Sequence, residues 1–454
     1  MITPRPTGGG FARLAVCLAV GPLVAACGAG TPSVTRPPYR TDSGSLAVHC
    51  GTLIDGRADQ PQHDVTAVIR DGRIVALMPG RDHPQDLRLL ELDGYTCLPG
   101  LIDMHTHMTE LPQDEADLKV FYTRTRDEAQ AIGVANAGAT LAAGFTTVRD
   151  VGTYVAWTDR ILRDSIDRGE VAGPRMQIAG FYLTIPGGGG DLLVPGVAES
   201  AIPARVRVGV TRGPAEFAKR AQLAVDGGAG LVKVIASGAV LAYGGVPDAN
   251  EMTREEIAAA VAVAHAAHLP VAAHAHGAQA IKDAILAGVD TVEHASYIDA
   301  EGIALAKAHG AALTMDVYNG DYTDTEGRRQ HWPEEFLRKN LESTEAQRRG
   351  FTAAHAAGVA IIFGTDAGVY PDGFNARQFP IMVQRGMTPM EAIKSATSLA
   401  AHYLGWEDRV GRLAPGLYGD LIAVQGDPLA DIGRLQDVAV VIKGGLPFKL
   451  PAPR

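Results

Sequence analysis

Hydrophobic and polar positions alternate in two segments that lie far apart in the sequence. The first covers residues 46–97, where Asp71-Gly72 separates two alternating runs and marks a β-hairpin turn. The second covers residues 406–454 and includes the runs "GDLIAVQGDP" and "DVAVVIKGG". We predict that both segments contribute strands to one small β domain, a β-sandwich that brackets the residues between them.

Between these segments the pattern changes to apolar strands that alternate with alanine-rich helices such as "REEIAAAVAVAHAAH". Eight strand–helix units in residues 98–405 predict an α/β fold, a closed (β/α)8 TIM barrel, with an open doubly wound sheet as the alternative. No GxGxxG motif opens a helix after a strand, so nothing supports dinucleotide binding. The expected strands are 97–104, 145–149, 175–183, 231–236, 270–274, 290–293, 311–317 and 359–364.

The first 45 residues have a different character. Arg5 and Arg13 precede a short apolar stretch that predicts a secretion signal over residues 1–27. Its end, "VAAC", resembles a bacterial lipobox, which implies a lipid on Cys27; an ordinary signal peptide is the alternative. Residues 28–45 are rich in Gly, Pro, Ser and Thr and predict a tether. We expect an exported lipoprotein of the bacterial cell envelope, held to the membrane only through this anchor.

Composition and charge narrow the choice of partners. The 454 residues are 46% hydrophobic and 20% charged, which is typical of a globular protein. A formal net charge of −10 without a cluster of basic residues argues against nucleic acid as a partner. Cys50 and Cys97 lie within predicted strands, where we expect two buried free thiols, although export also permits a disulfide bond.

Polar residues gather at the predicted carboxyl ends of the barrel strands, where barrel enzymes place their chemistry. His105 and His107 follow the first strand, and residues i and i+2 of a strand share a face, so both imidazoles can bind one ion. The remaining members of this set are Lys233 in "LVKVIAS", His274 and His276 in "VAAHAHG", His294 in "TVEHAS" and Asp366 in "FGTDAG".

Lys233 stands inside an apolar run, where an unpaired charge is costly. Three interpretations remain open on sequence alone. The lysine is paired with an acid, or its stem reaches the rim of the barrel. Alternatively, a lowered pKa lets it add carbon dioxide and become an anionic carbamate.

These motifs together resemble the amidohydrolase superfamily, in particular its imidazolonepropionase-like and Xaa-Pro dipeptidase branch, which also includes carboxypeptidases and ochratoxin-cleaving amidases. The carriers are "LPGLIDMHTHM", "GFTTVRDVG", "LVKVIASG", "VAAHAHG", "DTVEHAS", "FGTDAG" and "GRLAPGLYGDLIAV". The resemblance covers nearly everything after residue 45.

The resemblance implies a site for two divalent metal ions, with zinc as the usual metal. It assigns His105, His107 and Asp366 to the first ion, His274 and His294 to the second, and a carboxylated Lys233 as the bridge. Asp366 would also act as general base, accepting a proton from the water that the metals share, and then as general acid, passing it to the leaving amine. His276 would then either support a metal ligand or contact the substrate.

The loops depart from this pattern. Gly189 stands where close dipeptidase relatives often carry a histidine, and Ala239 replaces part of a common Gly-Gly-Val form. Candidate substrate contacts are Tyr243, His276, Arg149 and Tyr182. Residues 318–349 follow the seventh strand and predict either a lid over the site or a solvated helical insertion.

We therefore expect a metal-dependent hydrolase of amide or peptide bonds in a small peptide-like molecule. Dipeptides such as Xaa-Pro and N-acyl amino acids, ochratoxin-like amides among them, are the expected substrates. One alternative is a cyclic amide or amidine hydrolase or deaminase of the imidazolonepropionase type. Another is an envelope binding protein that contains metal without catalysis. Barrels of this kind often associate, so a homo-oligomer is also an expectation.

Overall fold

The computed structural model describes residues 42–451. The expectations for the signal, for the lipid on Cys27 and for most of the tether concern residues outside this range. Within residues 42–451, no helix is both long enough and apolar enough to cross a membrane.

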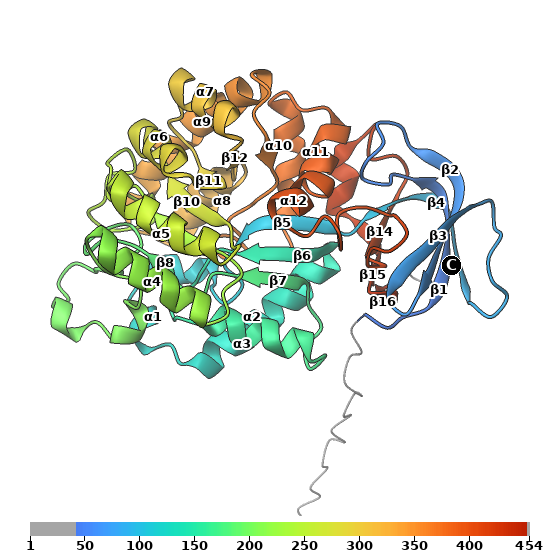
Figure 1. The fold of residues 1–454 in the computed structure, drawn as a ribbon, viewed down its shortest axis with the longest axis horizontal. Helices are drawn as coiled ribbons and strands as arrows, with labels where there is room; N and C mark the ends of the chain where they lie inside the picture. Colours follow the sequence, from blue (N-terminus) through green and yellow to red (C-terminus); the bar gives the residue numbers. More distant parts are fainter. Residues whose placement is uncertain (1–41, 452–454) are drawn as a thin grey trace, which may run out of the picture. The chain divides into compact units, whose positions relative to one another are not determined.

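A seven-stranded sheet contains both ends of the described chain. The amino-terminal strands are β1 (Leu46–Leu53), β2 (Gln62–Arg70), β3 (Arg73–Pro79) and β4 (Leu89–Pro99), and the carboxy-terminal strands are β14 (Leu421–Gln425), β15 (Val438–Lys443) and β16 (Leu446–Lys449). Their order is β16-β15-β14-β4-β1-β2-β3. Strand β14 pairs antiparallel with β4, so the two distant segments lie side by side, as Figure 1 shows. The prediction that both segments contribute strands to one small β structure is confirmed, and these strands form a single sheet.

Apolar side chains from six strands of this sheet form one core, from Leu46 on β1 to Ile442 on β15. The hairpin between β2 and β3 turns at Asp71 and Gly72, which both have positive φ, 47° and 78°. Positive φ at both central residues is the signature of the tight turn that an Asp-Gly pair predicts.

A disulfide bond joins Cys50 on β1 to Cys97 on β4. The expectation of two free thiols was wrong. The two cysteines are 47 residues apart in the sequence, but parallel pairing of β1 with β4 brings their Cα atoms to 5.9 Å, within the range of a disulfide bond. This pairing depends on the sheet order, which the separation in the sequence does not reveal.

The barrel strands are short, and neighbours in each sheet are parallel. They are β5 (Leu101–Thr106), β6 (Phe145–Asp150), β7 (Arg175–Ile178), β8 (Tyr182–Leu183), β9 (Val232–Ile235), β10 (Val271–Ala275), β11 (Thr291–His294), β12 (Ala312–Thr314) and β13 (Ile361–Ile362). The expected strand 175–183 is thus divided, with β7 pairing with β6 and β8 with β9.

Backbone hydrogen bonds close the barrel at the seams between these sheets. The amide of Met104 donates to the carbonyl of Phe363 at 2.9 Å, and that of Gly230 donates to the carbonyl of Ile178 at 2.8 Å. The predicted closed barrel is confirmed, and the open sheet is excluded.

Helices lie outside the strands (Figure 1). The alanine-rich amphipathic stretches form helices that alternate with the strands. In α5, for example, Thr253 caps the amino terminus, and Ile257, Ala260 and Ala264 are buried. The helices are α1 (Val120–Thr123), α2 (Arg126–Ala142), α3 (Thr158–Asp167), α4 (Pro214–Asp226), α5 (Arg254–Ala266), α6 (Ala278–Ala287), α7 (Ala300–His309), α8 (Asn319–Tyr322), α9 (Glu334–Ala356), α10 (Gln378–Gln384), α11 (Pro389–Ser395) and α12 (Ser398–Tyr403).

Candidate metal centre and active site

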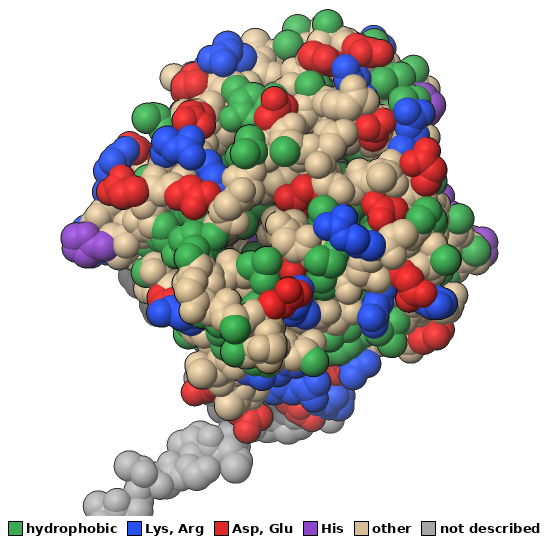
Figure 2. Space-filling model, turned by 90° about the vertical axis from the view of Figure 1, so that its left-hand side faces the viewer, with side chains coloured by type: hydrophobic (Ala, Val, Ile, Leu, Met, Phe, Trp, Pro, Cys, Tyr) green, Lys and Arg blue, Asp and Glu red, His purple; other side chains and the backbone are tan. Residues whose placement is uncertain are grey.

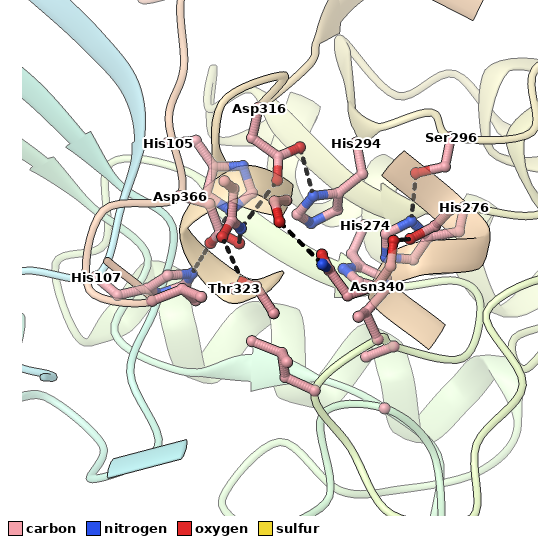
Figure 3. A pocket seen from close by; sticks show the side chains of 18 of the residues that line it. His105, His107, His274, His276, His294, Ser296, Asp316, Thr323, Asn340 and Asp366 are labelled. Atoms are coloured by element: carbon pink, nitrogen blue, oxygen red, sulfur yellow. Dashed lines mark hydrogen bonds and ion pairs between the residues drawn. The ribbon is translucent and has the colours of Figure 1, made fainter. Parts of the chain in front are cut away.

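Five histidines from three barrel strands converge at the carboxyl ends of those strands. His105 on β5 and His274 on β10 each lie one residue before the end of the strand, and His294 ends β11. His107 and His276 follow β5 and β10 directly. All five are buried. The ring centroids are 5.0 Å apart for His105 and His294 and 4.6 Å apart for His274 and His294. Figure 3 shows the rings pointing toward a shared space.

Asp366, which follows β13, joins two of these imidazoles. Its Oδ1 lies 3.3 Å from Nε2 of His105 and 3.2 Å from Nε2 of His107. The other ring nitrogens are held from behind: Nδ1 of His105 lies 2.8 Å from Glu293 Oε2, and Nδ1 of His107 donates to the carbonyl of Gly152 at 2.7 Å. Partners of this kind fix the ring orientation of metal-binding histidines.

Two overlapping groups of side chains have donor atoms within 4.8 Å of one another: His274, His276 and His294, and His105, His294 and Asp366. His294 belongs to both groups. Its Nδ1 lies 2.9 Å from Asp316 Oδ1, and Nδ1 of His276 lies 2.8 Å from Ser296 Oγ. Imidazole and carboxylate donors at this spacing are able to hold a divalent cation.

Burial shapes the charge of the cluster. It lowers the pKa of His274 well below the usual value, and the nearby His294, His276 and Lys233 lower it further. Burial also lowers the pKa of Lys233 to about 8, although the Glu293 carboxylate opposes this. Burial raises the pKa of Asp366, but the contacts with His105 and His107 outweigh it and hold that pKa well below its usual range. Asp366 is therefore ionised at neutral pH.

Positive backbone φ angles occur at the strand ends that carry the cluster. Asp366 has a φ of 62° and His294 one of 68°, in a region that residues other than glycine seldom adopt. Gly368 has a φ of 115°, and a Cβ there would lie 2.7 Å from the Cβ of His107. Such backbone strain is concentrated at functional sites.

A cavity of about 110 Å³ opens in front of the cluster. This is far more than the roughly 10–15 Å³ that one water molecule needs. The segment 318–349 forms one wall as helices, with Asn319 and Gly320 from α8, Thr323 after it, and Asn340, Ser343, Thr344 and Gln347 from α9. Other parts of the lining are Glu110, Glu115, Tyr154, Tyr182, Gly189, Gly190, Lys233 and Asp316.

The four candidate substrate contacts divide into two pairs. Tyr182 and His276 line the cavity, whereas Arg149 and Tyr243 do not. The Tyr243 ring packs against Phe336 instead, at 4.9 Å between centroids. The interpretation of Arg149 as a substrate contact needs correction, because it is fully buried and donates to Met104 O at 2.6 Å and Glu293 Oε1 at 2.8 Å. Its pair is Glu293, not the adjacent Asp150.

Several residues at the site were not predicted from the sequence. Glu293 holds His105, and Asp316 holds His294, as described above. Asn319 donates to Asp366 Oδ2 at 3.0 Å and to Asp316 Oδ2 at 3.2 Å. Asp316 had a usable signal, since it falls at the end of the expected strand 311–317. Glu293 immediately precedes a proposed ligand, but the sequence does not show that its side chain bonds to the strand across the barrel.

Comparison with known proteins identifies the family of this chain. The amidohydrolase family model matches residues 96–446, so the chain belongs to the amidohydrolase family. It is a hydrolase that acts on carbon–nitrogen amide bonds.

Individual relatives are similar over most of the chain. Ochratoxinase from Aspergillus niger is 29% identical over 452 residues, which cover 90% of this chain and 88% of that protein. Imidazolonepropionase from Cereibacter sphaeroides is 28% identical over 408 residues, 86% of this chain and 94% of that protein. The crystal structure of a Xaa-Pro dipeptidase with methionine bound in its active site superposes with a TM-score of 0.83 and 35% identity, covering 89% of this chain and 100% of that chain.

Proposed function

We propose that the protein is a binuclear metal-dependent amidohydrolase that cleaves the amide bond of dipeptides such as Xaa-Pro or of N-acyl amino acids. The observation that carries the proposal is the convergence of buried imidazoles, Asp366 and Lys233 on one cavity. Support for the substrate class comes from the ochratoxinase and the Xaa-Pro dipeptidase, which match nearly the whole described chain.

The donor set fits two divalent ions, most simply zinc. His105, His107 and Asp366 would hold the first ion, and His274 and His294 the second. Burial lowers the pKa of His107, but contact with Asp366 outweighs this effect and raises the pKa to about 9. The imidazole is therefore protonated at neutral pH, and a metal ion between these two side chains would replace that proton. His276 lies within reach of the second group, but its Nδ1 contacts Ser296, and we assign it to substrate binding.

Lys233 fits the role of a bridging carbamate. Burial is the largest influence on its pKa, and among the described residues no side-chain hydrogen bond contributes to it. A pKa of about 8 leaves a fraction of the amine neutral at pH 7. The neutral amine is the form that adds carbon dioxide. The product is an anionic carbamate, whose oxygen atoms are able to bind divalent cations, in place of a buried ammonium group.

In the reaction, the residues of this chain orient the substrate and move protons. Bound divalent ions would polarise the substrate carbonyl and make water a stronger nucleophile near neutral pH. Asp366, ionised in its buried position, accepts the proton of the attacking water and then delivers it to the leaving nitrogen. Asn319 holds Oδ2 of Asp366, which leaves Oδ1 directed at the histidines. Residues of the segment 318–349 form one wall of the cavity in which these steps would take place.

A substrate screen tests this function. The full chain, loaded with zinc in the presence of bicarbonate, is incubated with a library of dipeptides and N-acyl amino acids. We expect steady hydrolysis of some members, loss of activity with a chelator and recovery with added zinc. Full metal loading without turnover of any amide would contradict the proposal.

A further inference from the structure

The cavity contains a carboxyl group that the proposed mechanism does not use. Glu115 lies in the short 3-10 helix Pro112–Ala116, which follows β5, and lines the cavity with 6% of its surface exposed. Its Oε2 is buried and has no hydrogen-bond partner among the described residues. A buried carboxyl oxygen without a partner is costly, and a substrate group that donates a hydrogen bond to it would remove this cost.

A second buried carboxyl lies on the same side of the cavity. Glu110 is 7% exposed and lines the cavity as well. One of its oxygens, Oε1, accepts a hydrogen bond from the amide of Tyr154 at 2.9 Å. Repulsion between the two carboxyls adds to burial in raising the pKa of Glu115 well above its usual value. A raised pKa favours the protonated acid, and a cation bound beside the two carboxyls would favour their ionised form instead. We call Glu110 and Glu115 together the acidic region.

No arginine or lysine among the described residues forms an ion pair with Glu110 or Glu115. Protonated His107 is a cation that acts on both carboxyls, and a metal ion held by His107 would take the place of that proton. Arg124, whose charge Glu110 experiences, already forms two hydrogen bonds with Asp114, at 2.5 and 2.7 Å. Among the described residues that line the cavity there is no arginine, and Lys233 is the one lysine. If Lys233 becomes a carbamate, the cavity loses that positive charge too.

The two carboxyls of the acidic region lie in the cavity and are not part of an acidic patch on the face shown in Figure 2. Figure 2 shows acidic and basic side chains interspersed over the face that it presents. The excess of carboxyls at Glu110 and Glu115 is instead a property of the enclosed cavity, where charges interact more strongly than on the surface.

We propose that Glu115, assisted by Glu110, forms a subsite for a protonated amine of the substrate, so that the preferred amides carry a positive charge near the scissile bond. An ammonium group has three N–H donors and no acceptor, which suits carboxyl oxygens that lack donors. The amine is either the α-amino group of a dipeptide or the amine of a basic side chain. This inference rests on the proposed function, because it places the amine beside the bond that the metal centre would cleave.

Binding of matched hydroxamates to the metal-loaded full chain tests the subsite without requiring turnover. The first pair, L-alanine hydroxamate and its N-acetyl derivative, differs in the α-amine. The second pair, the N-acetyl hydroxamates of L-lysine and L-norleucine, differs in the side-chain amine. In the wild type we expect the amine-bearing member of at least one pair to bind about tenfold or more tightly than its match by calorimetry, as for a hydrogen bond to a charged group.

The variant Glu115→Gln keeps the shape of the side chain and removes the negative charge that it would carry beside a bound ammonium group. We expect it to abolish the preference for the amine and to keep the wild-type metal content. Asp372→Asn is the matched control, since Asp372 is another buried carboxyl but does not line the cavity; it should keep the preference.

Three outcomes would overturn the subsite: equal binding within both pairs in the wild type, a preference that persists in Glu115→Gln, or loss of metal in that variant. Equal binding would leave the proposed function intact. Failure of every hydroxamate to bind would count against both the subsite and the metal centre.

Discussion

At the scale of single residues, two buried lysines allow a direct comparison. Burial lowers the pKa of both Lys233 and Lys443 to about 8. Lys443 donates to the carbonyl of Gly173 at 2.7 Å and lies in the small domain, whereas Lys233 lines the cavity. A lowered pKa therefore does not by itself identify a lysine as a metal ligand. The two lysines differ in their position relative to the cavity.

We predict that Lys233→Ala lowers metal affinity by at least about tenfold and reduces activity with it, since ligand networks of this kind typically contribute that much. Elemental analysis of the folded protein after dialysis measures the metal. Lys443→Met is the control and should bind metal as the wild type does. Wild-type metal content in Lys233→Ala would contradict the bridging role.

Arg149 supports the site without touching the cavity. Its guanidinium pairs with Glu293, and Glu293 orients His105. Arg149→Met leaves the buried carboxylate without this cation, so we predict a loss of about 3–5 kcal/mol in the free energy of unfolding, measured with urea on metal-free protein. The double variant Arg149→Met/Glu293→Gln should recover much of this loss. A single variant within about 1 kcal/mol of the wild type would show that the pair contributes little.

Sequence reasoning at this scale found the residues that follow strands and missed those that act across the barrel. The i, i+2 spacing of His105 and His107 requires only local geometry, and the structure brings both to Asp366. The place of Arg149 depends on contacts with Thr291 and Glu293, more than 140 positions away in the sequence. No local pattern encodes such a contact, so its residue type alone suggested a substrate contact.

At the scale of elements, the loop after β13 contains a buried acid whose titration can be followed. Burial raises the pKa of Asp372 to about 7, and Thr140 donates to its Oδ1 at 2.8 Å. The folded state thus retains a proton that the unfolded state releases near pH 4. Stability from this group is greatest below that pH and is lost as the pH rises through about 7.

Asp372→Asn removes this titration and keeps an oxygen to accept the Thr140 hydrogen bond. We compare the free energy of unfolding of the metal-free variant with that of the metal-free wild type. As the pH rises from 4.5 to 8, we predict that this difference shifts in favour of the variant by roughly 1–3 kcal/mol. Urea unfolding at the two pH values measures the difference. A difference that is independent of pH would show that Asp372 titrates normally.

Element boundaries were predictable where the hydrophobic pattern was strong. The alanine-rich stretches became α5 and α6, close to the expected positions. The expected strand 175–183 is interrupted at Ala179–Phe181 because β7 and β8 pair with different neighbours. The segment 318–349 is helical and lines the cavity, and a sequence period does not show which face of a helix meets a cavity.

At the scale of the whole molecule, the seven-stranded sheet takes no direct part in the proposed chemistry. No residue of β1–β4 or β14–β16 lines the cavity. Replacing both cysteines, Cys50→Ala/Cys97→Ala, should lower the free energy of unfolding by about 2–4 kcal/mol, because the bond restricts the unfolded chain. Metal content and hydrolysis at 25 °C should stay at the wild-type level. Loss of metal from the folded double variant would contradict this expectation.

The overall fold was predictable because two independent patterns agreed. Eight strand–helix units predicted the barrel, and similar β runs at both ends predicted the shared domain. The disulfide bond was not predictable, because it depends on the parallel pairing of β1 with β4 inside that domain. Which remote strands lie side by side depends on the order of strands in the sheet, and the hydrophobic pattern does not reveal that order.

Anomalous diffraction from zinc-loaded crystals tests the central claim most directly. We predict two zinc peaks per chain in the cavity, the first among His105, His107 and Asp366 and the second beside His274 and His294. Extra density on the Lys233 amine should join the two peaks. Zinc peaks only elsewhere on the protein, or an empty cavity at full zinc loading, would contradict the account.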